Sequence, residues 1–471
     1  MNIKYTSIAL AVAASLASLS SFAADEAGIQ KKDGAVKASG FGIVSADGES
    51  SINLTGMVHY DGRLVRSNLP RVSDKDSASV ADGFEFRRVR LGVNGTVYKD
   101  VDYEIIINAT GTDTNILETG FLNFSANKDV QVRVGRFRQP YSLEAMTKDN
   151  AIDFLERSYG DQLGPNKQLG VGVWGEPRKG VTYALAISQA GFNEFTNVDN
   201  IGGLGTGRAT VNFGELSNLD GQVIHLGAST NRGKYEVVPV TSTDTFAASD
   251  GKSRATLLSY RTESRGLANA YRVQIGGEVL STVGYGLAAN DAANVNKTLN
   301  DLEFAYANGA FKFQAEASNL NLDATAASNV NLSTYNSVNL TSSTIYYDLI
   351  YNLTGEKWSD NYKGGSFGVV KPNSNFKLGE GGTGAWQLAI RVSSYKSNYT
   401  PVVAGNSRQE NSAGANTITY GVNWLLNPST AVKVNYAQTK FDTPVTYLST
   451  QPTGATTSTE NVFSVRAQIN F

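Results

Sequence analysis

The last eleven residues of the chain read N-V-F-S-V-R-A-Q-I-N-F, and their strict alternation of apolar and polar side chains constrains the fold most. Successive side chains of a β-strand point to opposite faces, so this segment has one apolar face and one polar face. The apolar face carries Phe463, Val465, Ala467, Ile469 and Phe471, and the polar face carries Ser464, Arg466, Gln468 and Asn470. In a soluble sandwich such a strand is a half-buried edge. In a membrane barrel, the apolar face contacts lipid and the polar face lines a water-filled lumen.

The beginning of the chain favours the membrane barrel. Lys4 precedes an apolar run over residues 8–19, and Ser21-Phe22-Ala23 supplies small residues for cleavage after Ala23. This pattern predicts a secretory signal peptide over residues 1–23. A retained membrane helix is the alternative, but the run is too short to span a bilayer. We therefore expect an exported outer-membrane protein, with a periplasmic segment over residues 24–50 and a barrel domain over residues 51–471.

Composition narrows the class further. The 471 residues include no cysteine, so disulfides and thiolate metal sites are excluded. The mean hydropathy is −0.24, and no segment after the leader is apolar enough for a transmembrane helix. The net charge of −2 indicates no nucleic-acid partner, and any ion preference must come from local charge placement. We expect no cofactor.

The two-residue period of the C-terminus recurs along the chain, as in residues 101–108, 311–318 and 345–352. Short turns are predicted near Tyr98–Asp100, Ala126–Asp129, Glu176–Gly180, Glu215–Gly221, Asn308–Gly309 and Leu426–Thr430, with a longer seventh break over Leu353–Gly384. If both termini are periplasmic, seven turns give eight hairpins. The sequence therefore predicts an all-β fold, a 16-stranded antiparallel transmembrane β-barrel.

Long polar segments separate the hairpins and are the expected extracellular loops. They are Ser67–Gly83, Arg138–Asn166 (the third loop), Asn231–Gly266, Asn319–Ser342 and Lys396–Asn416. Strand and loop are hard to separate over Leu267–Asn300.

Basic side chains occur at the polar positions of many predicted strands. They are Arg88, Arg90, Arg133, Lys312, Arg391, Lys433 and Arg466, and Arg136, Arg138, Lys148 and Arg157 bracket the third loop. Lys and Arg in a confined lumen can replace part of the hydration shell of a permeating anion. The alternative is a mixed-charge wall in which each cation pairs with a neighbour such as Asp102, Glu104 or Glu316.

Several ordered motifs resemble a known family. They are F-R-R-V-R-L-G-V-N-G-T at residues 86–96, V-G-R-F at 134–137, L-E at 143–144, F-L-E-R at 154–157, L-T-G-E at 353–356, V-K-P at 370–372, G-A-W at 384–386 and G-V-N-W at 421–424. Their order and spacing resemble the phosphate- and polyphosphate-selective O/P porins. The resemblance implies a homotrimer of sixteen-stranded barrels whose pores are constricted by inward-folded loops and used by anions.

The resemblance also implies roles for individual residues. Arg157 lies where the third loop returns at the constriction of the pore. The alternative is a plain ion pair of Arg157 with Glu156 or Asp153. Lys363 and Lys371 match basic positions of the family on the long periplasmic turn, which folds up into the pore. The alternative is that they are solvated lysines on a loop. Glu118 matches an acidic residue that positions the lysine of the phosphate site.

Further basic residues belong to the same expectation. Arg87 and Arg133 are expected to line the pore, and Arg88 and Arg136 to steer anions toward the constriction.

Two departures from the family pattern concern selectivity. Ala145 occupies the position of a key lysine of the phosphate-selective members. Their ladder of arginines is also missing, although Arg254, Arg261 and Arg265 resemble a thinned remnant. We therefore expect an anion-preferring channel for phosphate or polyphosphate with weaker phosphate binding than the specialised members.

Three other functions are weighed against this one. A general or sugar-permeable porin is the closest rival, followed by a plugged structural or adhesive barrel. A hydrolase is disfavoured because His59 and His225, the only histidines, have no serine and carboxylate pattern around them. The expected partners are phosphate or other small anions, outer-membrane lipid, the barrel-assembly machinery and two further copies of the chain.

Overall fold

The computed structural model describes residues 37–39, 41–67, 82–110, 116–189, 203–237, 255–266, 271–275, 293–326, 337–402, 411–446 and 456–471. The signal peptide expected over residues 1–23 lies outside the described residues. No helix within the described ranges is both long and apolar enough to pass through a bilayer.

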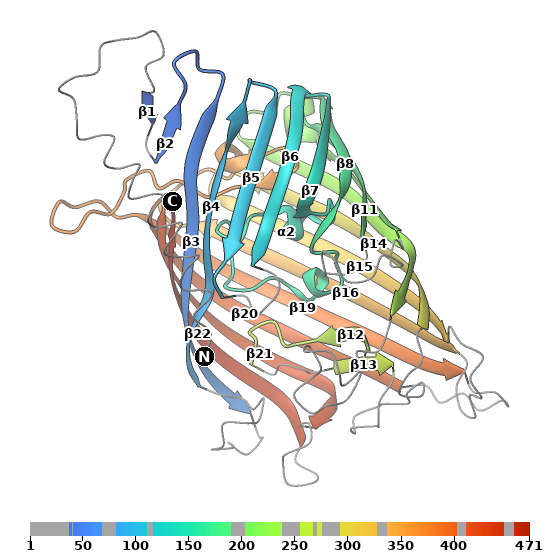
Figure 1. Ribbon diagram of the computed structural model, residues 1–471. Coiled ribbons are helices and arrows are strands. Elements are labelled where there is room, and N and C mark those ends of the chain that lie inside the picture. Colours follow the sequence, from blue (N-terminus) through green and yellow to red (C-terminus); the bar gives the residue numbers. More distant parts are fainter. Residues whose placement is uncertain are drawn as a thin grey trace, which may run out of the picture.

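Sixteen antiparallel strands close into one barrel (Figure 1). They are β3 (Ser51–Ser67), β4 (Gly83–Val97), β5 (Val101–Asn108), β6 (Leu117–Asn127), β7 (Val130–Arg138), β8 (Lys167–Arg178), β9 (Val181–Gln189), β10 (Gly203–Asn212), β11 (Gln222–Val237), β14 (Ala293–Asn308), β15 (Phe311–Ala326), β16 (Ser337–Asn352), β19 (Ala385–Val402), β20 (Asn411–Asn427), β21 (Thr430–Thr446) and β22 (Thr456–Asn470). The C-terminal strand β22 pairs with β3 and closes the barrel. The sequence-based prediction of fold and strand number is confirmed.

Residues before the barrel continue its wall. The short strands β1 (Lys37–Ser39) and β2 (Gly42–Val44) pair with each other, and β2 pairs with the start of β3, with Gly42 opposite Asn53. Residues 24–36 of the expected periplasmic segment lie outside the described part of the chain.

All seven predicted turns connect strands as expected. The shortest, such as the one at Gly309 between β14 and β15, join neighbouring strands directly. The turn between β10 and β11 contains the helix α3 (Phe213–Leu216). The turn between β16 and β19 is long and contains η2 (Ser359–Asn361), β17 (Tyr362–Lys363) and β18 (Ser366–Phe367). We call residues 353–384 the periplasmic turn.

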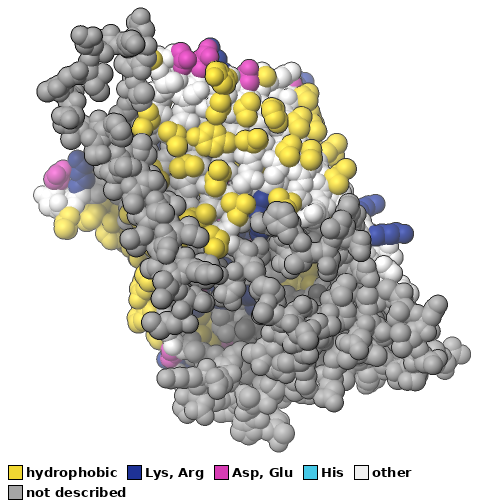
Figure 2. Space-filling model, viewed as in Figure 1, with side chains coloured by type: hydrophobic (Ala, Val, Ile, Leu, Met, Phe, Trp, Pro, Cys, Tyr) yellow, Lys and Arg dark blue, Asp and Glu magenta, His cyan; other side chains and the backbone are white. Residues whose placement is uncertain are grey.

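The outer face of the barrel carries apolar side chains. Leu64, Phe86, Ile105 and Leu122 are all exposed on β3 to β6. Figure 2 shows hydrophobic side chains spread across the wall formed by strands β3 to β8, with charged side chains at its upper edge. This is the surface that lipid covers in a transmembrane barrel.

The longer strands extend beyond the apolar band, and there their polarity inverts. In β15, Phe313 and Ala317 face outward while Glu316 faces inward, but farther along Asn319 faces outward and Leu320 is buried inside. The strand therefore continues with the same period of two, polar outside and apolar inside. The predicted loop boundaries at Asn231, Asn319–Ser342 and Lys396–Asn416 are wrong, because the polar outward face of these strand ends resembles a loop in the sequence.

Two extracellular segments fold into the barrel. The third loop contains α2 (Leu143–Met146) and η1 (Tyr159–Gln162), and a second segment contains the hairpin of β12 (Ala255–Tyr260) and β13 (Tyr271–Ile275). Tyr159 of the third loop packs against Tyr260 of β12 and Tyr395 of β19, with ring centroids 6.0 and 4.9 Å away. These rings belong to an apolar cluster that also includes Leu299, Leu320, Leu322 and Leu340 on the inner wall. The inverted parts of the strands thus hold the inward loops.

Candidate functional site

The third loop is anchored to the inner wall through backbone amides and Glu144. The amides of Leu143 and Glu144 each donate a 2.8 Å hydrogen bond to the Glu316 carboxylate on β15. The Glu144 carboxylate accepts hydrogen bonds from Arg391 of β19 at 2.6 Å and from the Ser158 hydroxyl at 2.6 Å. The loop is therefore pinned across the lumen at both its outgoing and its returning limb.

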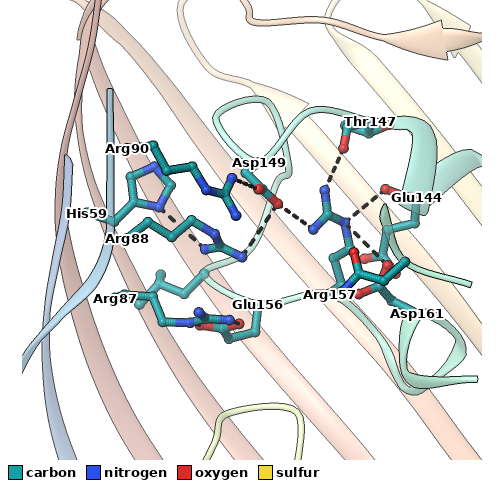
Figure 3. Close-up of polar contacts among 12 residues, drawn as sticks. His59, Arg87, Arg88, Arg90, Glu144, Thr147, Asp149, Glu156, Arg157 and Asp161 are labelled. Atoms are coloured by element: carbon teal, nitrogen blue, oxygen red, sulfur yellow. Dashed lines mark hydrogen bonds and ion pairs between the residues drawn. The ribbon is translucent and has the colours of Figure 1, made fainter. Parts of the chain in front are cut away.

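Asp149 joins the third loop to the opposite wall (Figure 3). Its carboxylate accepts a short hydrogen bond from Arg90 of β4, lies 3.5 Å from Arg88, and accepts a 2.5 Å hydrogen bond from Arg157. Burial alone would raise the pKa of this carboxyl, but Arg88, Arg157 and Arg90 outweigh burial and hold its pKa well below the usual range. Asp149 is therefore ionised at any physiological pH.

Arg157 is buried and uses its guanidinium group within the loop. Besides Asp149 it donates to the carbonyl oxygens of Glu144 at 3.0 Å and Thr147 at 2.6 Å, and it lies 3.7 Å from Asp161. Its carboxylate partners are thus Asp149 and Asp161. The guanidinium holds the loop's shape while adding a positive charge to the lumen.

Glu156 forms a second centre next to the first. Arg87 of β4 donates two hydrogen bonds to it, at 2.8 and 3.0 Å, and Arg466 of β22 donates one at 3.1 Å. Arg63 lies 3.5 Å away. Burial would raise the pKa of Glu156, but Arg87 and Arg466 outweigh it and keep that pKa well below the usual range.

Glu118 lies at the edge of the same network. It forms a 2.5 Å ion pair with Arg90 and accepts a 2.7 Å hydrogen bond from Lys167 of β8. The lysine that it holds is therefore Lys167, next to the base of the third loop. Through Arg90, Glu118 is connected to Asp149.

Cations outnumber carboxylates in this region of the lumen. Among the described residues, six cationic side chains (Arg87, Arg88, Arg90, Arg138, Arg157 and Lys167) pair with four carboxylates (Glu118, Asp149, Glu156 and Asp161), and Glu156 is shared further with Arg63 and Arg466. We call this group the arginine cluster. It surrounds the limbs of the third loop with an excess of positive charge.

Arg133 and Arg136 lie on β7. Arg133 is held between the rings of Phe121 and Trp174, 4.0 Å from each ring centroid, and donates to Asn123 at 3.2 Å. Arg136 is buried three residues farther along the strand, toward the third loop. Along β7, Arg136 is closer than Arg133 to Arg138, which belongs to the arginine cluster.

The periplasmic turn enters the barrel from the other end. The Tyr362 hydroxyl lies 2.6 Å from Nδ1 of His225, and the Gly365 carbonyl accepts a 2.8 Å hydrogen bond from Arg208. Trp358, Tyr362 and Phe367 of the turn share an apolar cluster with Leu143 and Phe154 of the third loop, so the two inward segments meet inside the lumen. Lys363 and Lys371 are exposed on this turn, and neither joins the ion pairs of the arginine cluster.

The other basic strand residues face the lumen, as their positions predicted. Most have a carboxylate partner: Lys312 donates to Asp153 at 2.6 Å, Arg391 to Asp348 at 2.8 Å, and Arg466 to Asp61 at 2.6 Å. Lys433 instead donates to the carbonyl of Ile152 at 2.5 Å. The mixed-charge wall therefore coexists with the arginine cluster.

A cavity of about 620 Å³ lies between the arginine cluster and the inward hairpin. We call it the vestibule. Arg261, Arg265 and Lys297 line it, and none of the three has an ion pair among the residues the structure describes. Arg254 lies outside the described residues. The lining also includes the apolar side chains of Leu204, Leu257, Leu258, Leu320 and Leu322.

Glu263 lines the vestibule together with the acidic residues Glu156 and Asp161, and it belongs to the inward segment after β12. Its carboxylate accepts a 3.2 Å hydrogen bond from the backbone amide of Tyr159. Burial raises the pKa of Glu263 to about 7, although the positive charge of Arg391 opposes the rise. The charge of this wall therefore changes near neutral pH.

Comparison with known proteins places the chain in a family. The family model for phosphate-selective porins O and P matches residues 52–471. The chain belongs to this porin family. It is 26% identical over 419 residues to Porin O of Pseudomonas aeruginosa, which covers 86% of each chain.

A solved structure with a TM-score above 0.5 supports the fold. A loop-deletion variant of OmpT, an outer-membrane protein of Vibrio cholerae, has a TM-score of 0.51 and 11% identity, covering 90% of this chain and all of that one. An anion-selective porin from Comamonas acidovorans has a TM-score of 0.47 and 13% identity, covering 90% of this chain and all of that one.

The chain is therefore a porin of the outer membrane, and it is a channel rather than an enzyme. Its two histidines have structural positions: His225 bonds to Tyr362 and Glu303, and His59 lies 3.5 Å from Arg88.

Sequence reasoning missed several residues of this site in the porin. Asp149, Asp161 and Lys167 were not predicted, although they complete the network of Arg157 and Glu118. Asp149 precedes Arg157 by eight residues and Asp161 follows it by four, so proximity in sequence was the available signal. The two-residue period cannot indicate which of the nearby carboxylates pairs with Arg157, because the third loop is not a strand.

Proposed function

We propose that this porin is an anion-preferring diffusion channel that conducts phosphate and polyphosphate. The observation that carries the proposal is the excess of cations along one lumenal path, from the unpaired Arg261, Arg265 and Lys297 of the vestibule to the arginine cluster. A net charge of −2 gives no bulk attraction for anions, so selection depends on these local charges.

Two kinds of cation have different roles in this proposal. Arg157 and Arg87 donate their hydrogen bonds to protein acceptors. They therefore attract anions through their positive potential and hold the third loop in place. Exposed Lys363 and Lys371 on the periplasmic turn retain donors for a passing anion. Arg88, Arg133 and Arg136 contribute to the potential along the β4 and β7 walls.

Phosphate binding is expected to be moderate. Ala145, at the position where the specialised members carry a lysine, is buried in α2, where its amide donates to Ser142. Ala145 supplies no positive charge at this position, so phosphate lacks the binding energy of one charge-assisted hydrogen bond. Such a contact contributes roughly 1.5–3 kcal/mol.

Phosphate titration in a planar bilayer tests the proposal. Chloride current through the porin should fall as phosphate is added, and Lys363→Ala/Lys371→Ala should weaken this block by about tenfold, which corresponds to about 1.4 kcal/mol. Lys377→Ala is a matched control, because Lys377 is an exposed lysine of the same turn that pairs with Glu380. If phosphate leaves the chloride current unchanged in the parent and in both variants, the result favours a general porin instead.

The apolar wall of the vestibule favours a second candidate permeant, an organic anion with an apolar group. Pockets that bind organic ligands combine apolar walls with few, placed charges, and the vestibule has this composition. Benzoate and phosphate can be compared as blockers of chloride current. If benzoate blocks the parent more strongly than phosphate does, and Leu322→Ser removes this difference, the result supports the candidate. If benzoate blocks the parent and Leu322→Ser equally weakly, the candidate is rejected.

We also propose that three copies associate through strands near the N- and C-terminal ends. On this wall Tyr60, Phe84 and Phe86 form an exposed aromatic group, with ring centroids 5.8 Å (Tyr60–Phe84) and 5.2 Å (Tyr60–Phe86) apart. Such groups are typical of protein interfaces. Native mass measurement in detergent should give a trimer that is weakened by Phe86→Ala, and a monomer alone would reject the proposal.

A further inference from the structure

The outer wall of the barrel contains a groove of about 1120 Å³ across strands β9 to β19. Small side chains produce it. Gly207 and Ala209 of β10, Ala228 of β11 and Ala317 of β15 point outward, where other strands carry large apolar side chains. In the register of the sheet, Ala209 is opposite Ala228, and Leu302 of β14 lies between Ala228 and Ala317.

The groove lies at the extracellular edge of the apolar band. Its lower row includes the exposed side chains of Leu302 and Ile345. Its upper row is polar and runs across consecutive strands as Thr230, Asn300, Asn319, Ser343 and Lys396. Outward-facing residues change from apolar to polar between these rows, so the groove is placed where acyl chains of the outer leaflet meet their headgroups.

Two cations lie at the upper edge of the groove. Arg232 of β11 is held over it by hydrogen bonds of 3.0 Å to Thr230 and 3.0 Å to Asn300. Lys396 of β19 extends from the far end of the upper row. Neither has an ion pair within the described ranges. Four strand spacings separate β11 from β19, a distance of about 19 Å.

We propose that this groove binds a phosphate-bearing lipid of the outer leaflet, with acyl chains over the alanine row and phosphate groups on Arg232 and Lys396. Cations without a carboxylate partner at a membrane interface attract anionic headgroups. The depression left by Gly207, Ala209, Ala228 and Ala317 provides room for methylene chains that a flat wall would lack. Because the groove is on the outer face and the vestibule is inside, this site is independent of conduction.

Lipid retention tests the proposal on the full porin purified in mild detergent. Delipidated protein is titrated with a phosphorylated outer-membrane glycolipid and with its dephosphorylated form, and bound lipid is counted by native mass spectrometry. We expect the phosphorylated form to bind at least tenfold more tightly, and Arg232→Glu/Lys396→Glu to abolish that difference. Ala228→Trp, which fills the groove without changing charge, should reduce binding of both forms.

Lys440→Glu is the matched control, because Lys440 is an exposed lysine of β21 outside the groove. It should leave lipid binding unchanged, and all variants should retain the bilayer conductance of the parent. Equal binding of the two lipid forms, or binding that survives both the charge reversal and Ala228→Trp, would overturn the proposal. Loss of trimers in Ala228→Trp, with lipid binding unchanged, would assign the groove to a second copy of the chain instead.

Discussion

Arg157 donates a 2.5 Å hydrogen bond to Asp149, and this contact links the returning limb of the third loop to the arginines of β4. Asp149 is the only partner shared by Arg88, Arg90 and Arg157 among the described residues. Asp149 thus joins the loop to β4, in addition to the anchors that Glu144 and Glu316 provide on the other side of the lumen.

Asp149→Asn should destabilise the folded barrel and raise its anion preference. Removing one member of a buried charge network typically costs about 3–5 kcal/mol, because the remaining charges lose their compensation. Urea unfolding in lipid vesicles measures the loss, and the reversal potential in a KCl gradient measures the added positive potential. Lys440→Asn, at an exposed position on β21, controls for a general effect of substitution.

Acid should have little effect on this link. A carboxyl whose pKa is lowered in the folded state stabilises the fold fully above its ordinary pKa, and loses that contribution only as pH falls through the lowered value. Since the pKa of Asp149 and that of Glu156 both lie well below the usual range, conductance between pH 7 and pH 4 should keep its noise level. Loop opening near pH 5 would contradict these assignments.

Arg157→Lys separates charge from geometry. Lysine keeps the positive charge but cannot reproduce the fork that joins Asp149 to the Glu144 and Thr147 carbonyls. We expect current noise to rise in Arg157→Lys while the reversal potential stays close to that of the parent. Arg157→Ala should increase noise and also lower anion preference. If both variants lose phosphate block equally without added noise, Arg157 contacts the anion directly.

Glu263 should make selectivity depend on pH near neutrality. Burial raises its pKa to about 7, so it is protonated at pH 6 and ionised at pH 8, when it places a negative charge on the vestibule wall. Anion preference should fall between these two pH values, and Glu263→Gln should remove the change. Because the unfolded carboxyl ionises near pH 4.5, the folded inward hairpin also loses stability as pH rises from about 4.5 to 7.

Tyr362→Phe should loosen the periplasmic turn. It removes the contact of the Tyr362 hydroxyl with Nδ1 of His225, leaving a buried polar atom without its partner, at a cost of about 1–3 kcal/mol. Larger and more variable single-channel conductance is the expected result. Tyr351→Phe is a control on the exposed outer face of β16 and should behave as the parent.

The barrel itself could be predicted from sequence because the alternation of side chains along a strand is local. Arg466 and Arg391 were placed on the lumenal face by this rule alone, and both are there. The same rule misled where strands leave the membrane: Asn319 faces outward and Leu320 inward, so a polar stretch that is a strand was assigned to a loop.

The site could be predicted only in part. Resemblance to the O/P porins drew attention to Arg157 and Glu118, but their partners depend on how the third loop folds back over many residues. The pairing of Glu316 with the amides of Leu143 and Glu144 joins residues 173 and 172 positions apart in the sequence, and no local pattern encodes it. The inward apolar cluster around Tyr159 and Tyr395 was missed for the same reason.

The most direct test of the account is the reversal potential of the porin in a KCl gradient, before and after Arg261→Glu/Arg265→Glu. These two arginines line the vestibule without ion pairs among the described residues, so reversing them should not leave a buried carboxylate unpaired. We expect a potential with the sign of chloride permeation in the parent, and a shift toward cation permeation in the variant. A parent that prefers cations, or a potential that the double substitution leaves unchanged, would contradict it.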